Sequence, residues 1–336
     1  MAVLRGFISE LVLGKESSYG TAPSSGQTVP FKSESLTAQV GSVEVPIIRG
    51  SLYKAPDVKG LKKVAGSITG ILGYEGYEAL LVAALGEVST TDNGDGTYTH
   101  AITPATTLSK SLTAWIDRGP RIFRFSGLKV NALTLKGEAA LDGGLVEWEA
   151  EFVGKDFDSN SSFPGTVNAD KGEPYVMVDQ LSVKLGDQED ALGASDVLYP
   201  STFELKIANN LVEDHYAAGS DTVLEPVRGG WLEITLTLGF PRFQDSPDDL
   251  TLLRTWAEQK TALQATLTFS YGSDYSLAIK LGNLRVKEGA EPQVGGPEVG
   301  GIEITLEGFV NDSVYNNPNL SDALKVELKN KVSSAW

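Results

Sequence analysis

A stretch near the middle of the chain, residues 126–152, returns without a gap at residues 282–308. Both copies alternate apolar and polar side chains on either side of a glycine, Gly144 in the first copy and Gly300 in the second. A period of two is typical of β-strands that bury one face, so each copy is predicted to be a pair of strands. The chain is therefore expected to contain a duplicated β-unit.

The elements around the two copies are predicted to follow one order: a strand, a long loop, a strand, a helix and three strands. The predicted strands cover residues 33–40, 63–72, 112–116, 122–135 and 146–153 in the first half, and 203–208, 231–240, 263–269, 275–286 and 302–310 in the second. The predicted helices cover residues 74–85 and 246–257. An additional hairpin over 91–102, turning at Asp95-Gly96, is expected in the first half alone.

These patterns divide the mainly β chain into five parts. Residues 1–30 are punctuated by glycine and proline and are predicted to be an N-terminal arm that frays or lies on a partner. Two domains are predicted over residues 31–157 and 175–312, with a linker over 158–174 that is rich in Ser, Asn, Asp, Gly and Pro. Residues 313–336 are predicted to be a helical tail in which Ser321 and Asp322 start a short helix.

Composition excludes several classes of protein. The absence of cysteine excludes thiolate metal sites and thiol nucleophiles. A formal charge of -16 argues against a protein that binds nucleic acid by neutralising phosphates. No apolar run approaches the roughly 20 residues that a membrane helix needs, and no signal peptide is predicted. We expect a protein that is made and assembled in the cytoplasm and has no membrane partner.

Motifs for catalysis or metal binding are weak. Neither His100 nor His215 has a second histidine or a carboxylate pattern beside it at metal-binding spacing. The run from Asp92 to Gly96 partly resembles a calcium loop, but glycines occupy two expected ligand positions, so a hairpin turn is the better interpretation. No serine nucleophile motif is present. The sequence therefore predicts no enzymatic activity, no cofactor and no metal site.

Five glutamates form a candidate functional row. Because side chains alternate along a strand, Glu147, Glu149 and Glu151 are expected on one face of their strand, and Glu303 and Glu307 on the corresponding face of its copy. Three interpretations remain open at this point. The row is a pair of carboxylates acting on a sugar, the solvated face of a half-buried sheet, or an acidic wall facing a channel.

The order of the elements resembles a known family. The relevant runs are residues 14–21, residues 64–70 leading into a leucine-rich helix, residues 151–154, residues 207–211 and residues 229–236. Together they resemble the major tail tube proteins of long-tailed, siphovirus-type bacteriophages and prophages, over most of residues 10–312. Each motif is short and apolar, so their order carries the resemblance.

The resemblance implies two tandem β-sandwich or barrel domains, each with one flanking helix. In this family the inner sheets of neighbouring domains join into a continuous barrel, and the rings stack into a tube for DNA and the tape-measure protein. Most members carry one such domain and form rings of six. A duplicated domain therefore suggests a trimer that acts as a pseudo-hexamer.

Under this resemblance the chain is a structural component of the virion, assembled in the host bacterial cytoplasm. Its partners are other copies of itself, the tape-measure protein, and tail-tip and terminator proteins. The five glutamates become candidates for the channel wall, where carboxylates repel DNA and let it pass without tight binding. Contacts between rings or subunits are expected from the arm at 1–30, the loops at 41–62 and 211–230, and the C-terminal helix.

The alternative is a non-catalytic carbohydrate-binding β-sandwich, such as a tail-associated adhesin. In that case the row at Glu147, or an exposed Trp115 or Trp231, would contact sugar.

Overall fold

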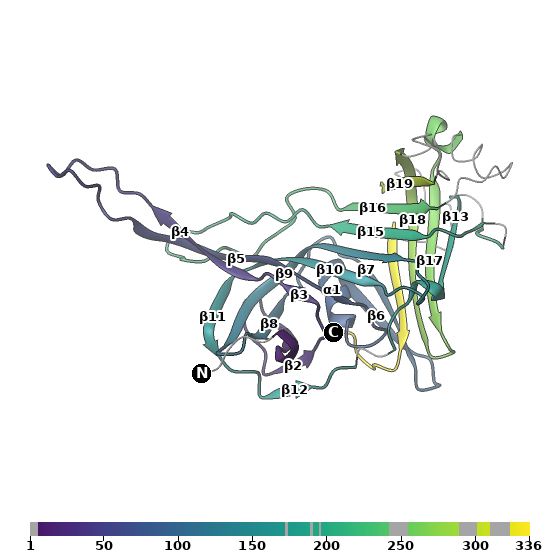
Figure 1. Cartoon of the computed structure of the whole chain (residues 1–336), viewed down its shortest axis with the longest axis horizontal. Coiled ribbons are helices and arrows are strands. Elements are labelled where there is room, and N and C mark those ends of the chain that lie inside the picture. The colour runs from purple at the N-terminus through teal and green to yellow at the C-terminus, as the bar shows by residue number, and fades with distance from the viewer. Residues whose placement is uncertain are drawn as a thin grey trace.

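The computed structural model describes residues 6–171, 174–188, 191–194, 196–241, 255–288, 301–309 and 323–336. The described chain is mainly β, which confirms the predicted class (Figure 1). Its strands form three sheets that share two long strands. Two short 3₁₀ helices, η1 (Gly6–Ile8) and η2 (Val178–Gln180), and one α-helix accompany them.

The first sheet lies in the N-terminal half. Its strands are β1 (Leu11–Lys15), β2 (Ser25–Thr28), β8 (Leu112–Asp117), β11 (Asp156–Ser161), β12 (Thr166–Asn168) and the first part of β9 (Ile122–Glu138). The strand order is β12-β2-β1-β8-β9-β11, and only β12 and β2 are parallel.

The central sheet runs through both halves of the chain. Its strands are β3 (Ser33–Glu34), β4 (Thr37–Val43), β5 (Val58–Ile71), β10 (Glu147–Gly154), β15 (Thr202–Ala208), β16 (Glu233–Phe240), β19 (Ile302–Gly308), the second part of β9 and the last part of β18 (Tyr275–Glu288). From the edge formed by β3 and β4, the order is β5-β10-β9-β15-β16-β19-β18, with every neighbour antiparallel.

The third sheet combines strands of the C-terminal half with the hairpin of the first half. Its strands are β6 (Gly86–Asp92), β7 (Tyr98–Pro104), β13 (Leu181–Asp187), β14 (Val197–Leu198), β17 (Leu263–Tyr271), β20 (Leu324–Asn330) and the first part of β18. The order is β14-β13-β17-β18-β20-β7-β6. The β6-β7 hairpin confirms the predicted turn, and it extends further than residues 91–102.

The two long strands pass from one layer to the next. Residues 122–128 of β9 pair with β8, whereas residues 129–136 pair with β10 in the central sheet. In the same way, β18 pairs first with β17 and then with β19. Phe203 of the central sheet packs on Phe269 of the third sheet with ring centroids 5.6 Å apart. The pairings β8-β9-β10-β5 of the first half thus recur as β17-β18-β19-β16 in the second.

The α-helix α1 (Glu78–Leu85) starts later than predicted and is buried on all sides. The ring of Tyr77, just before the helix, meets Trp148 of the central sheet edge-on at 6.0 Å. Strand β9 and the β6-β7 hairpin pack against the helix. In the second half, residues 255–259 are helical, and the predicted helix start at residue 246 lies outside the described residues.

Two predicted boundaries are wrong. The N-terminal arm contains β1, whose Leu11, Val12 and Leu13 are buried between β2 and β8 in the first sheet. The predicted linker contains β11 and β12, which add strands to the same sheet. Both segments therefore belong to the body of the first half.

The predicted C-terminal helix is also wrong, since residues 324–330 form the strand β20. Leu324, Val326, Leu328 and Asn330 are buried and alternate with exposed or half-exposed neighbours. This is the period of a strand, and β18 and β7 flank β20 on its two sides. The proposed cap at Ser321 and Asp322 lies outside the described residues.

One hairpin projects far beyond the rest of the molecule. In Figure 1 the chain between β4 and β5 runs out to one end of the long axis as an extended arm. Its side chains include apolar residues that are largely or fully exposed, namely Ile47, Ile48, Leu52 and Tyr53. We call residues 44–57 the hairpin arm.

A glycine in the β9-β10 turn is predicted to be essential for the repeated strand pair. Gly144 has φ +70°, and a Cβ there would lie 2.0 Å from the backbone oxygen of Glu138. Gly272 has φ +61° with open space around it. We expect Gly144→Ala to lower the free energy of unfolding by at least about 1–3 kcal/mol more than Gly272→Ala, because only the first adds a clash to the backbone strain. Equal losses in urea denaturation would refute this.

Candidate functional site

The five predicted glutamates lie on one face of the central sheet. In β10, Trp148, Ala150 and Phe152 point into the core, which turns the alternate glutamates Glu147, Glu149 and Glu151 to the opposite face. In β19, Ile304 and Leu306 are buried in the same way, so Glu303 and Glu307 face outward.

The register across the sheet shows that the two sets share a face. Glu149 pairs with Thr134, Thr134 with Lys206, Lys206 with Thr235, and Thr235 with Glu307. Residues that pair directly in a sheet project on the same side. Three strands, β9, β15 and β16, separate the two glutamate strands. We call this side of the central sheet the acidic face.

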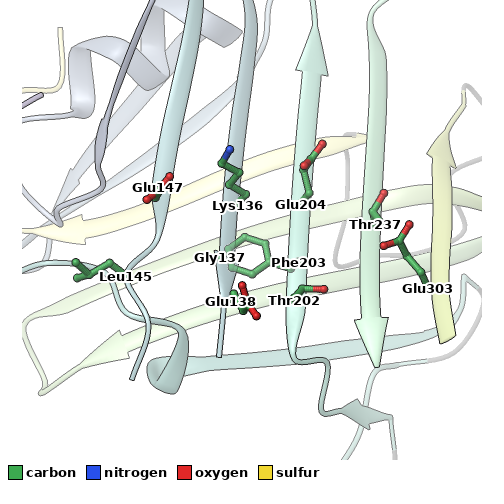
Figure 2. A pocket seen from close by; sticks show the side chains of 10 residues that line it. All are labelled: Lys136, Gly137, Glu138, Leu145, Glu147, Thr202, Phe203, Glu204, Thr237 and Glu303. Carbon is green, nitrogen blue, oxygen red and sulfur yellow. The ribbon is translucent and has the colours of Figure 1, made fainter. Parts of the chain in front are cut away.

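The acidic face holds more charged residues than the sequence patterns indicated. Glu138, Glu204 and Glu233 lie on it, as do Lys136 and Lys206. In Figure 2, Glu147, Lys136, Glu204, Thr237 and Glu303 stand on five adjacent strands. The alternation of residues 203–208 marks Glu204 and Lys206 as outward-facing, but only the pairing of β15 with β9 brings them beside Lys136.

Lysines neutralise part of the acidic face. Lys32 Nζ lies 2.5 Å from Glu147 Oε1, and Lys287 Nζ lies 3.4 Å from Glu307 Oε1. Lys136 stands between Glu147 and Glu204 in the register. The remaining outward positions of β16 and β19 are mostly threonines. The face is therefore polar and negatively charged, with few apolar side chains.

A pocket lies on this face across β9, β10, β15, β16 and β19. Residues that line it include Lys136, Glu138, Glu147, Glu204 and Glu303 (Figure 2). Acid–base chemistry on a sugar needs two carboxylates that flank the scissile bond. The carboxylates of this pocket all project from one face of a single sheet, so they do not face each other across a cleft. Within the described part of the chain, no three His, Asp or Glu side chains are grouped to hold a metal ion.

Three of the other sequence candidates, His100, the run from Asp92 to Gly96 and Trp115, have structural roles, whereas His215 is exposed. His100 is buried between Thr90 and Asn330, and burial lowers the pKa of its imidazole. The run from Asp92 to Gly96 forms the β6-β7 turn, in which the carboxylates of Asp92 and Asp95 accept hydrogen bonds from backbone N–H groups two residues on. The aromatic candidates differ from each other: Trp115 is 2% exposed in the core, whereas Trp231 is 86% exposed.

A comparison with known protein families identifies the family of the chain. A family model described as phage tail tube protein matches residues 6–308. The chain belongs to the phage tail tube protein family. A search of curated proteins found no match. No helix in the described residues has the length and apolarity to cross a membrane.

Proposed function

We propose that this tail tube protein is the major tube subunit of a siphovirus-type tail. It assembles into stacked rings whose lumen is the channel for DNA ejection, and it has no enzymatic activity or cofactor. Residues 31–157 and 175–312 act as two tube domains that arose by duplication, with β1, β11 and β12 added to the first. Its partners are other copies of itself, the tape-measure protein, and tail-tip and terminator proteins, and it assembles in the host bacterial cytoplasm.

The observation that carries the proposal is the junction between the two halves. Residues 202–208 of β15 pair with residues 132–138 of β9, so the central sheet crosses from the first half to the second without a break. Leu135 and Leu205 are register partners there, and both are buried. One chain therefore contains the kind of sheet-to-sheet contact that a ring of tube domains requires.

The two ends of the central sheet support ring closure by further copies. Within the described residues, β3 and β4 pair with β5 alone, and residues 285–288 of β18 pair with β19 alone. Exposed strand edges carry unpaired backbone groups that invite another strand. Three chains with two domains each would close a ring of six similar units.

The acidic face is proposed to line the channel. Carboxylates on the wall repel the phosphates of DNA, so the genome can slide without adhering to the protein. The interleaved lysines, Lys136 and Lys206, are outnumbered by the glutamates of the whole acidic face, which include those on β10 and β19.

The hairpin arm is proposed to contact an adjacent ring. Ile48, Leu52 and Tyr53 are 103%, 93% and 81% exposed, which is costly for apolar side chains unless another surface covers them. Charge does not drive this contact, because Arg49 and Lys54 are balanced by Glu44 and Asp57 within the arm, and Lys54 lies 3.7 Å from Glu44 and 3.6 Å from Asp57. The exposed apolar side chains favour docking on a second copy.

Removing the apolar side chains of the arm is predicted to block stacking. We expect the triple variant Ile48→Ser, Leu52→Ser, Tyr53→Ser to raise the concentration needed for tube formation at least about tenfold, because each side chain loses apolar burial at the contact. Stability of the isolated chain should stay within about 0.5 kcal/mol, since these positions are exposed. Sedimentation of tubes at a series of protein concentrations measures the concentration needed for assembly. If assembly were unchanged in the triple variant, the proposed role of the arm would be refuted.

Negative-stain microscopy of the purified protein tests the proposed function. Regular hollow rods or rings are expected. Monomers that stay monomeric at high concentration and bind a glycan would instead support the carbohydrate-binding alternative, for which the exposed Trp231 offers a stacking surface.

A further inference from the structure

The last strand of the chain joins its two halves in a second layer. β20 pairs on one side with β18 of the C-terminal half, from Ser276 opposite Lys329 to Leu281 opposite Leu324. On its other side it pairs with β7 of the N-terminal half, from Val326 opposite Ile102 to Asn330 opposite Tyr98. The β6-β7 hairpin and β20 therefore connect the two halves of the chain through the third sheet, outside the central sheet (Figure 1).

A buried asparagine fixes the end of this strand. The side-chain amide of Asn330 donates to the backbone oxygen of Tyr74 at 2.8 Å and to Glu78 Oε1 at 2.6 Å. Its carbonyl oxygen accepts from the backbone N–H of Val332 at 2.9 Å and lies 3.1 Å from His100 Nε2. The amide thus uses all of its donors and two acceptor positions although Asn330 is fully buried.

The protonation state of His100 fits its hydrogen-bond partners. Because an amide oxygen can only accept, Nε2 of His100 carries the proton, and Nδ1 accepts from the hydroxyl of Thr90 at 2.8 Å. Burial lowers the pKa of His100 and raises the pKa of Glu78. Both groups sit on the first half, so one residue of β20 satisfies polar atoms of β7 and α1 together.

This cluster specifies a single register for β20. A slip by two residues keeps the same face inward but replaces Asn330 with Leu328 or Val332. His100, Glu78 and the carbonyl of Tyr74 would then lose their partner in a buried site, which is strongly unfavourable.

The residues after β20 extend the contact over the first half. The backbone N–H of Lys331 donates to Glu75 Oε1 at 3.3 Å, while its ammonium lies 2.7 Å from Asp274 in the second half. Ala335 is buried, and Lys110 Nζ lies 5.0 Å from the ring centroid of Trp336. The end of the chain therefore contacts both halves.

We propose that residues 324–336 are a clasp that sets the angle between the two halves of the chain. Neighbouring strands in a single sheet tolerate a range of twist, so the β9-β15 pairing alone does not fix the angle between the halves. Side-chain contacts such as those of Lys129 with Glu225 and of Arg228 with Ala105 also join the halves. The strand β20, fixed in register by Asn330, adds a paired strand between β7 and β18 and restricts the angle further. Where the halves act as two tube domains, an inference that rests on the proposed function, this angle decides whether chains close into a ring.

Distance measurements between the halves test the clasp in the isolated chain. The chain contains no cysteine, so Val167→Cys in β12 and Tyr199→Cys after β14 place spin labels on exposed positions of the two halves. The distance distribution should be narrow with the clasp intact. Asn330→Leu, and truncation after residue 323, should widen it at least about twofold, since twist between strands ranges over about 10–35°.

Two further variants keep the test decisive. Lys325→Gln, on the outer face of β20, should leave the distribution unchanged. If the Asn330→Leu variant does not fold, the double variant Lys331→Ala, Trp336→Ala can be used, because it leaves the residues of β20 unchanged. It should still broaden the distance distribution. A narrow distribution in these folded clasp variants would overturn the proposal. The distance distributions could change as expected while the protein forms no tubes. That combination would refute the proposed function but support the clasp.

Discussion

Replacing Glu149, Glu151, Glu303 and Glu307 with lysine is expected to yield tubes that assemble but retain DNA. All four side chains lie on the acidic face and point away from the core, so the fold and the β9-β15 junction should survive. Each substitution converts a group that repels phosphate into one that binds it. In stacked rings these lysines would form a continuous basic surface along the channel.

The effect should be strongly salt-dependent. Binding of DNA to the variant tubes is expected to fall with added salt at a log–log slope of about -0.9 for each phosphate neutralised. Particles carrying the variant should lose infectivity more than about tenfold, since DNA that is bound along the whole tube leaves slowly. Co-sedimentation of tubes with labelled DNA over a salt series measures the binding, and plaque counts measure the infectivity.

Two controls separate charge from position. The matched variant with glutamine at the same four positions removes the carboxylates without adding cations, and it should bind little DNA. A second variant with Glu87→Lys changes an exposed acid of β6, in the third sheet. If this control retained DNA as strongly as the four-lysine variant, the proposed place of the acidic face in the channel would be wrong.

Leu205→Asp is expected to have the largest effect on stability. Leu205 is fully buried in β15 and faces Leu135 across the junction between the halves. An aspartate there would bury an unpaired carboxylate and remove a core side chain, which should cost about 4 kcal/mol or more. We expect the second half to unfold at lower denaturant concentration and tubes to be absent.

The adjacent residue supplies a matched control. Lys206 lies in the same strand but points to the acidic face, so Lys206→Ser should change the free energy of unfolding by about 0.5 kcal/mol or less. Urea denaturation followed by tryptophan fluorescence measures both variants. Similar losses for Leu205→Asp and Lys206→Ser would mean that the junction is not the packed contact described above.

Local periodicity in the sequence predicted most strands because they bury one face. The glutamates of β10 and β19 were predictable for the same reason, since each alternates with a buried side chain such as Trp148 or Ile304. What periodicity could not show is that β15 pairs with β9. That contact joins residues distant in the chain, and a pattern within one strand carries no information about its neighbour.

The errors in predicting β1 and β20 have specific causes. Leu11, Val12 and Leu13 of β1 are buried in succession, so the strand shows no alternation. In β20, Leu324 and Leu328 have the spacing of a helical stripe, and only the burial of Val326 and the polar Asn330 shows the period of a strand. Asn330 looks like a surface residue in sequence because its partners, His100 and Glu78, come from the other half of the chain.

A cryo-microscopy reconstruction of the assembled tube would count the chains in each ring and locate the acidic face. We expect three chains in each ring, with the central sheet continuous around the lumen and with Glu149 and Glu307 on the inner wall. Six chains in each ring, or an acidic face turned to the outside of the tube, would contradict this expectation.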